Sequence, residues 1–289
     1  MEFSRKNLAR QALIRALEIR QKLNIPTHYP LDIYSVCEQL NVTVQFINIP
    51  SGEGIYWRED GEERIFISAQ RPLPRRAFTC GHELGHHLFN HGSTMDELEE
   101  STGRSQFDPQ EFLADCFSGF LLMPKLAVES AFSSRRWTPA TATPLQIFTI
   151  ACSFGVGYNT LIDHMAYSLQ LILQAKAKEL KKSSPKIIRQ ELLGEPSANP
   201  LMIVDKQWLL KTIDVEVGYQ LLLPKTVQFE GDAISFQADL EQGQLFGANR
   251  QGIVRVHCSK SDWSAFIRVA RSEYKGFSQY RHSEESDDE

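Results

Sequence analysis

The residues with the clearest capacity for chemistry lie between positions 82 and 91, which contain four of the eight histidines of this 289-residue chain. They begin with the string His82-Glu83-Leu84-Gly85-His86. In a helix, the i, i+4 spacing places His82 and His86 on one face, so both imidazoles can bind a single cation. Glu83 then projects beside them, where its carboxylate can hold a water molecule on the metal.

Two protein ligands do not complete a metal site, and a third is expected on the next predicted helix. Glu111 and Asp115 lie there at i, i+4 spacing, and the small Ala114 between them permits close approach of two helices. A ligand set of His82, His86 and Glu111 leaves the fourth zinc position open, as catalytic zinc requires. Asp115 can accept a hydrogen bond from a ligand histidine and so fix its tautomer.

The spacing alone leaves other interpretations open. His82 and His86 could simply cover a helix surface, and Glu111 could be a solvated charge, because so short a motif also arises by chance. His91 cannot join the same set of ligands by helix geometry, and surface or polar-cluster roles are expected for both His87 and His91.

The helix that carries the motif is expected from Arg75 to about Asn90, and the helix with Glu111 from Asp108 to Leu122. Upstream, residues 5–23 show apolar residues at helical spacing, and a short helix is expected over residues 31–40.

Three strands are expected between the helix over residues 31–40 and the helix that begins at Arg75. Residues 42–49 alternate apolar and polar side chains, and two further β-rich runs, 54–58 and 64–68, are separated by a segment whose Asp60-Gly61 pair is a hairpin signal. The sequence therefore predicts an antiparallel sheet ahead of Arg75.

The middle of the chain has the pattern of a helix-turn-helix. Two short helices are expected on either side of Gly155-Val156-Gly157, with His164 where an apolar residue is preferred. The second helix, residues 158–166, contains Asp163 and no Lys or Arg, although reading DNA requires donors aimed at bases and phosphates. Packing or docking of a partner protein is favoured over DNA binding.

The C-terminal region is expected to be a separate, mostly β module that ends in a helix over residues 262–274. The adjacent His257 and Cys258 suggest a metal site only weakly, and a buried strand pair is favoured. The residues after Gln279 form an acidic tail that is expected to be disordered.

Composition limits the class of protein. The chain is 42% hydrophobic and 23% charged, which fits ordinary packed domains, and no apolar stretch approaches the length that crosses a bilayer. A formal net charge of -5 argues against general affinity for nucleic acid or anionic lipid. The five cysteines lack the spacings of disulfide frameworks or zinc ribbons, so free buried thiols are expected. We expect a cytoplasmic protein without a membrane partner, because basic residues interrupt the start of the chain where a signal peptide would be apolar.

With these motifs in place, the chain resembles the ImmA/IrrE family of zinc-dependent metallopeptidases over about residues 5–170. The resemblance rests on the HExxH string and on the segments around it: Arg76-Ala77-Phe78-Thr79, Glu111, Ala114-Asp115, Phe117 and Leu121-Leu122-Met123-Pro124. It departs from many relatives at Leu113 and Cys116, neither of which is a proposed ligand.

The resemblance implies an α+β fold whose first part is a zincin-like metallopeptidase domain. The expected division is a peptidase domain over 1–125, a helix-turn-helix-like segment over 126–183, a linker over 184–195, a β-rich domain over 196–278 and a disordered tail over 279–289. The resemblance also implies a cytoplasmic endopeptidase that inactivates a helix-turn-helix repressor in response to stress or a mobile-element signal.

The ligand set suggests a mechanism in which Glu83 takes the proton of the attacking water and passes it to the leaving amine. Zn²⁺ is the expected ion, and Mn²⁺ or Fe²⁺ are alternatives because a His2Glu set discriminates weakly among them. An oxyanion-stabilising side chain is also expected, and Tyr56 and the histidines near His91 are candidates among which the sequence does not choose.

A second function of a different class stays open: a non-catalytic or DNA-associated regulator built on a peptidase fold. The presence of Glu83 beside all three ligands favours the enzyme, because a binding module has no need for a general base.

Overall fold

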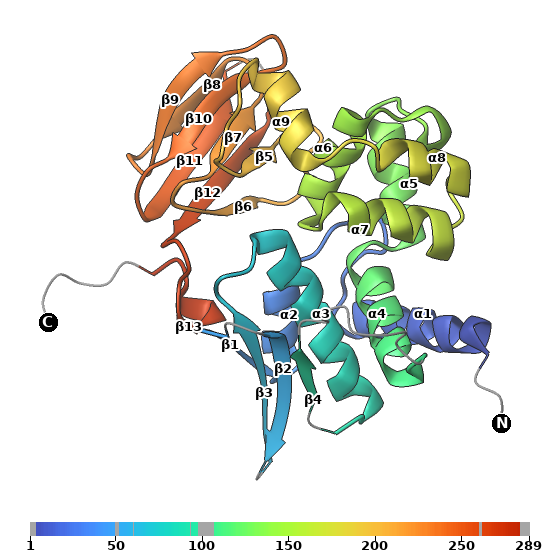
Figure 1. Ribbon diagram of the computed structural model, residues 1–289. Coiled ribbons are helices and arrows are strands. Elements are labelled where there is room, and N and C mark those ends of the chain that lie inside the picture. The colour runs from blue at the N-terminus through green and yellow to red at the C-terminus, as the bar shows by residue number, and fades with distance from the viewer. Residues whose placement is uncertain are drawn as a thin grey trace, which may run out of the picture.

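The structure is a computed structural model that describes residues 4–49, 52–59, 61–92, 94–97, 107–259 and 262–283. Three parts follow one another along the chain: a mixed sheet with its helices, a group of short helices, and a β-rich part (Figure 1). The sheets are mainly antiparallel and the chain also has a separate group of helices, so the fold is α+β, as predicted.

The first part is built on a five-stranded sheet in the order β13-β1-β3-β2-β4. Strands β2 and β3 form the predicted antiparallel hairpin, but β1 pairs with β3 in parallel, so the expectation of a purely antiparallel sheet is wrong. The chain leaves β1 and crosses to the far side of β3 before the hairpin returns, which makes β1 and β3 run in the same direction. The strands are β1 (Thr43–Ile47), β2 (Gly52–Glu59), β3 (Glu62–Ser68), β4 (Thr94–Glu97) and β13 (Gly276–Phe277).

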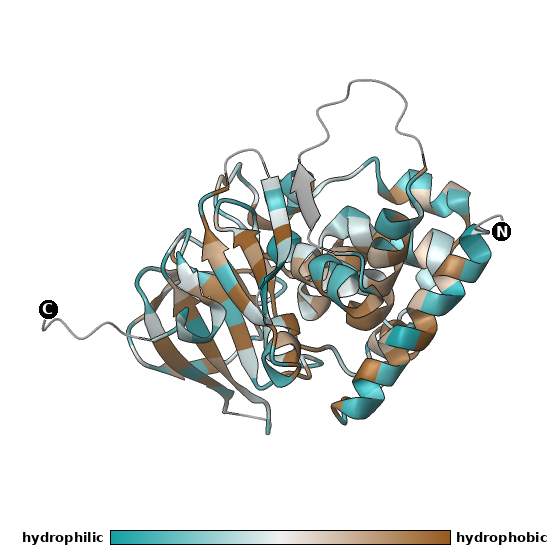
Figure 2. Ribbon diagram, turned by 90° about the horizontal axis from the view of Figure 1, so that it is seen from below, coloured by the Kyte–Doolittle hydropathy of each residue, from teal (hydrophilic) through white to brown (hydrophobic). Residues whose placement is uncertain are grey.

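Four helices accompany this sheet: α1 (Arg5–Lys22), α2 (Ile33–Gln39), α3 (Leu73–Phe89) and α4 (Pro109–Leu122). Each lies within a few residues of its predicted range. Helix α4 packs against both α1 and α3. Helix α1 is amphipathic as expected, and hydrophilic residues are interspersed with hydrophobic ones along its length (Figure 2).

A row of small residues lets α3 and α4 approach closely. A Cβ atom added at Gly85 would lie 3.1 Å from the Cα atom of Ala114, and one added at Gly81 would lie 2.5 Å from the hydroxyl oxygen of Ser118. The predicted role of Ala114 in close helix approach is therefore confirmed. The start of α4 is fixed by Asp108, whose carboxylate accepts a hydrogen bond from the backbone N–H of Gln110.

The middle part contains the two helices expected around residues 155–157. Gly155 ends α6 with a left-handed backbone (φ 63°), and α6 is bent by 101° from the segment that begins with α7, within the range of a helix-turn-helix. The elements are α5 (Lys125–Ser134), η1 (Pro139–Thr141), α6 (Pro144–Phe154), α7 (Tyr158–Asp163), η2 (His164–Ser168), α8 (Gln174–Leu180) and α9 (Pro185–Leu193).

Helix α9 falls within residues 184–195, where a linker is expected, so this stretch is helical in the structure. Ser184 caps the helix by accepting from the N–H of Ile187, and Ile188 is buried. The composition suggested a solvated connection because only one side of this helix packs against the protein.

In the described part of the chain no single helix is long and apolar enough to span a bilayer. One bent pair, α6 with the α7–η2 segment, passes the same test of length and composition when its two helices are taken together.

The β-rich part, residues 201–270, is here called the β-module. It has two four-stranded sheets, β5-β7-β10-β9 and β6-β12-β11-β8, which meet where Phe229 contacts Phe246. Its strands are β5 (Leu201–Ile203), β6 (Thr212–Glu216), β7 (Gln220–Leu223), β8 (Val227–Glu230), β9 (Ile234–Asp239), β10 (Gln244–Ala248), β11 (Gly252–Cys258) and β12 (Ser264–Ala270).

Strand β12 replaces the helix predicted over residues 262–274, so that prediction is wrong. Ala265, Ile267 and Val269 are buried while Ser264 and Phe266 between them are exposed, which is the alternation of a strand. The strand lies between β6 and β11, and these partners decide its conformation.

After the β-module the chain returns to the first sheet, where β13 pairs with β1. Residues 278–280 form a short 3-10 helix (η3, Ser278–Tyr280), and Arg281 lies against Asp214 and Asp32. The predicted boundary between a β-rich domain and a tail at residue 278 therefore falls inside an ordered segment. Of the predicted tail, residues 284–289 lie outside the described residues.

Candidate metal centre

Helix α3 positions the histidines of the motif. It begins after Pro72, with a second proline in its first turn, and ends at Asn90, whose left-handed backbone (φ 57°) closes the helix. The motif residues His82, Glu83 and His86 are all buried, because this face of α3 lies against β2 and α4.

The three expected ligands come together. The Nε2 atoms of His82 and His86 are 3.0 Å apart, and the Glu111 carboxylate lies against both, with Oε2 3.1 Å from Nε2 of His82 and Oε1 3.4 Å from Nε2 of His86. Ligand atoms at about 2.0–2.1 Å from a tetrahedral ion would be separated by about 3.3 Å. The triangle of these three side chains therefore has separations close to those around a tetrahedral zinc ion. Within the described ranges this is the one cluster of His, Cys, Asp and Glu side chains that could hold a metal ion.

Hydrogen bonds on the outer side of each imidazole also fit a cation. The Nδ1 atom of His82 lies 2.9 Å from Asp115, and since a carboxylate only accepts, His82 donates there and turns the lone pair of Nε2 inward. This is the role that the sequence suggested for Asp115. Inside the triangle, that lone pair faces a carboxylate oxygen, an arrangement that a shared cation stabilises.

His86 has a corresponding partner in His91, whose Nδ1 atom lies 3.1 Å from Nδ1 of His86. A proton on Nδ1 of His86 leaves its Nε2 available to a metal, just as Asp115 does for His82. Burial lowers the pKa of His91 below its ordinary value, which favours a neutral ring able to accept that proton. His91 thus has a polar-cluster role, as expected, although the sequence did not indicate which histidine it would orient.

Glu111 completes the triangle from α4 and opens it to solvent. The neighbouring His82 and His86 hold the pKa of its carboxyl well below the ordinary value, against the opposite effect of burial. The carboxylate is therefore ionised at neutral pH, as a metal ligand must be. The Glu111 side chain remains 45% exposed, so the centre can be reached from this side.

Glu83 lies beside the triangle and against strand β2. A Cβ atom at Gly54 would fall 2.7 Å from a carboxylate oxygen of Glu83 and 2.5 Å from the methyl carbon of Thr79. Gly54 is therefore the residue of β2 that leaves room for this carboxylate. The sequence placed Gly54 in a strand but gave no sign of this contact, because it joins residues of different elements.

Tyr56 and His87, two candidates for oxyanion stabilisation, contact each other. The Tyr56 hydroxyl is 3.0 Å from Nδ1 of His87, and Tyr56 is buried. His87 in turn lies 3.5 Å from Glu63, so these side chains form a polar cluster of their own.

His257 and Cys258 lie in β11 opposite Gln228 and Val227 of β8, and they are the predicted strand pair rather than a metal site. All five cysteines are unpaired, as expected, and four of them are buried.

A comparison with known families finds a match over the part of the chain that builds this centre. Residues 37–164 match the family described as Peptidase_M78, the IrrE N-terminal-like domain. This range includes the hairpin, both motif-bearing helices and the α6–α7 pair. No curated protein matches the chain.

Proposed function

We propose, from the match of residues 37–164 to the IrrE N-terminal-like domain, that this chain is a zinc-dependent endopeptidase. The observation that carries the proposal is the convergence of His82, His86 and Glu111, whose facing nitrogen and oxygen atoms are separated by 3.0 to 3.4 Å. Two helices supply these ligands, and Glu83 lies next to them. This combination suits hydrolysis of a peptide bond. The zincin-like character of the domain is part of the same proposal.

The metal, when bound, would polarise the scissile carbonyl and lower the pKa of a water molecule. The protein's own residues do the remaining work. His82, His86 and Glu111 hold the ion, and Asp115 and His91 keep the two imidazoles in the tautomer that binds it. Mn²⁺ or Fe²⁺ could occupy the same ligands.

Glu83 is the proposed general base and acid. It accepts the proton of the attacking water at its carboxylate and donates that proton to the nitrogen of the leaving amine. Strand β2 keeps the carboxylate out of bulk water, since Glu83 is fully buried and Gly54 leaves space for it. A fixed, buried carboxylate needs little reorganisation during the reaction.

The proposed substrate is a helix-turn-helix transcriptional repressor, cleaved in response to stress or a mobile-element signal. Support for this comes from the family resemblance of the motifs and not from the geometry of the centre. Identification of a repressor encoded near this gene would supply the substrate to test.

The decisive experiment is incubation of the zinc-loaded protein with such a repressor, followed by mass spectrometry of the products. We expect one discrete cut, which stops on metal chelation and resumes when zinc is restored. Glu83→Gln should retain metal and reduce cleavage by about 10²- to 10⁴-fold, because the amide is nearly isosteric but cannot act as a base.

Two outcomes would contradict the proposal. Cleavage by Glu83→Gln at the rate of the unmodified protein would remove Glu83 from the mechanism. Cleavage that survives chelation would show that the metal centre is not the catalyst.

We also propose that the α6–α7 pair supports or docks a protein partner and does not read DNA. Tyr158, Leu161 and Ile162 of α7 are buried, and the helix has no Lys or Arg to contact phosphates. Purified protein should therefore show no sequence-specific binding to duplex DNA at physiological salt in a gel-shift titration. A specific shift that disappears when Asn159 is changed would favour the regulator over the enzyme.

A further inference from the structure

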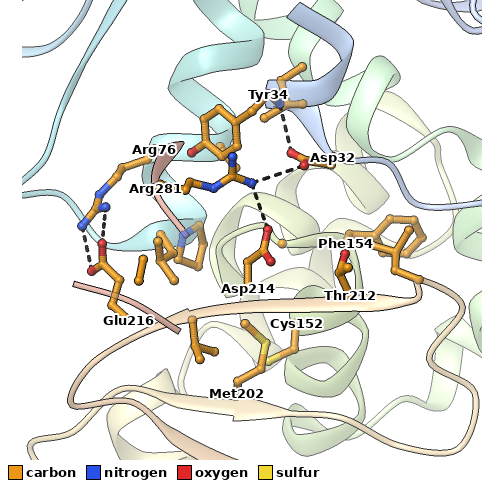
Figure 3. Close-up of a pocket in the computed structure, with 18 of the residues that line it drawn as sticks. Asp32, Tyr34, Arg76, Cys152, Phe154, Met202, Thr212, Asp214, Glu216 and Arg281 are labelled. Atoms are coloured by element: carbon orange, nitrogen blue, oxygen red, sulfur yellow. Dashed lines mark hydrogen bonds and ion pairs between the residues drawn. The ribbon is translucent and has the colours of Figure 1, made fainter. Parts of the chain in front are cut away.

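A second site lies away from the metal centre, where the three parts of the protein meet. A partly open cavity of about 130 Å³ lies between the start of α3, the end of α6 and strand β6 of the β-module (Figure 3). Protein interiors contain few voids larger than a water molecule. A cavity of this size at a junction of three segments is therefore unusual and has room for a small ligand.

Most of the cavity wall is apolar. It includes Phe46, Leu73, Leu122, Phe154, Met202 and Val215, which come from all three parts of the chain. An apolar cavity of roughly 150 Å³ in another protein stays dry and binds benzene. The dimensions here therefore suit a molecule about as large as one aromatic ring.

Charged side chains line one side, but they neutralise one another. Arg76 pairs with Glu216 at 2.5 and 3.0 Å, and Arg281 lies 3.0 Å from Asp214 and 3.3 Å from Asp32 (Figure 3). Arg268 makes a bidentate contact with Asp214, with both distances 2.6 Å. Three guanidinium groups thus balance three carboxylates, and a charged ligand would bring an uncompensated charge out of water.

His282 supplies a polar group that the protein does not use. Its side chain is 10% exposed and lines the cavity, and neither ring nitrogen has a hydrogen-bond partner among the described residues. The Nε2 atom lies 3.5 Å from Asp214, and Nδ1 makes no hydrogen bond within the described part of the chain. Burial lowers the pKa of His282, so the ring is neutral at neutral pH and can accept or donate one hydrogen bond. Buried polar atoms without partners are rare in folded proteins and mark places where a ligand or water binds.

We propose that this cavity binds a small, uncharged, mainly apolar molecule about the size of one aromatic ring, which carries a single hydrogen-bonding group directed at His282. The site does not depend on the proposed peptidase activity. Leu73, Pro74 and Ala77 of its wall belong to α3, so an occupant would touch the helix that carries His82 and His86 and would bridge it to the β-module.

The first test uses phenol as the probe, on the full chain, by isothermal titration calorimetry. Phenol should bind saturably, in the millimolar range or tighter, as expected for a ligand of so few atoms. Benzoate and benzylammonium have the same ring with opposite charges, and each should bind at least tenfold more weakly. Absence of saturable phenol binding would overturn the proposal, and tighter binding of either ion would overturn its neutral character.

Two variants locate the binding. Ala270 of β12 lines the cavity, and Ala270→Leu should fill part of it and weaken phenol binding at least tenfold. Ala175→Leu, on the exposed face of α8, is the matched control and should bind as the unmodified protein does. Circular dichroism checks that both variants fold.

His282→Phe tests the polar group even if Ala270→Leu does not fold. It preserves a ring of similar shape but removes Nδ1, so phenol binding should fall about fivefold, the value of one hydrogen bond, while toluene binding stays unchanged. Equal binding of phenol by His282→Phe and the unmodified protein would show that His282 does not contact the ligand. Loss of toluene and phenol together would show that the change had altered the cavity itself.

Discussion

Two regions of this molecule bury histidines to a similar degree and use them in different ways. His82 and His86 of α3 are 5% and 0% exposed, and His164 at the end of α7 is 6% exposed. The inward nitrogens of the first pair face each other and a carboxylate, which are all acceptors. His164 instead lies 3.0 Å from the carbonyl oxygen of Met123, which its Nε2–H can satisfy, and it packs against Gly119. Burial alone therefore does not identify a ligand; the chemistry of the groups that the ring nitrogens face does.

The largest difference between the two histidine regions is expected in metal binding, when a side chain from each region is replaced. His82→Ala and Glu111→Ala should each abolish stoichiometric metal binding, because the remaining two ligands cannot complete the site. His164→Gln should keep about one ion per chain. Elemental analysis of dialysed protein measures the occupancy. Full occupancy in both ligand variants would mean that the ion binds elsewhere.

A smaller effect is expected from the residue that orients His82. Asp115→Ala should weaken metal binding by about 10- to 100-fold, because the imidazole loses the partner that fixes its tautomer. Asp163→Ala is a matched control, since that carboxylate pairs with Lys181 beside His164 and has no metal ligand to orient. Competition against a chromogenic chelator gives both affinities. Equal affinity in the Asp115 variant would make its contact with His82 incidental.

His164 should also make the free energy of unfolding depend on pH in a way that can be measured separately from the metal-site histidines. Burial lowers its pKa from 6.5 to about 4, so the unfolded chain binds a proton more readily than the folded one. Its stabilising contribution is complete above about pH 6.5 and is lost as the pH falls toward 4. Between pH 7.5 and pH 5, the loss is on the order of 2 kcal/mol.

His164→Gln should remove this part of the pH dependence, because the amide can still donate to Met123 but does not titrate. Urea unfolding at the two pH values, with and without the substitution, isolates His164 from the metal-site histidines, which both proteins share. An identical change in the free energy of unfolding for the two proteins would show that His164 is protonated without cost in the folded state.

The candidate site could be predicted from the sequence to a large extent, because its geometry is local. The spacing of His82 and His86 and that of Glu111 and Asp115 each fix a helix face within one turn. Ala114 indicated that the two faces could meet. The contacts of Gly54 with Glu83 and of His91 with His86 required the folded arrangement, since a side chain's neighbours across elements leave no pattern in the sequence.

The fold was less predictable where partners are distant in the chain. Residues 262–274 contain apolar residues at spacings that suit a helix as well as a strand, and pairing of β12 with β6, about fifty residues earlier, decides the outcome. The parallel pairing of β1 with β3 likewise depends on the path of the chain and not on the alternation within either strand. Helix α9 was missed because a single buried residue, Ile188, anchors it.

The two residues of β13 have a consequence for how the protein could be divided. They occupy the outer side of β1, where Gln45 pairs with Phe277 and Phe46 with Gly276. A fragment that stopped before Gly276 would present the backbone N–H and C=O groups of β1 as an uncovered strand edge. Such edges act as templates for pairing between molecules. Residues 276 and 277 thus cover the outer edge of the first sheet, and we expect a fragment that lacks them to self-associate more readily than the full chain.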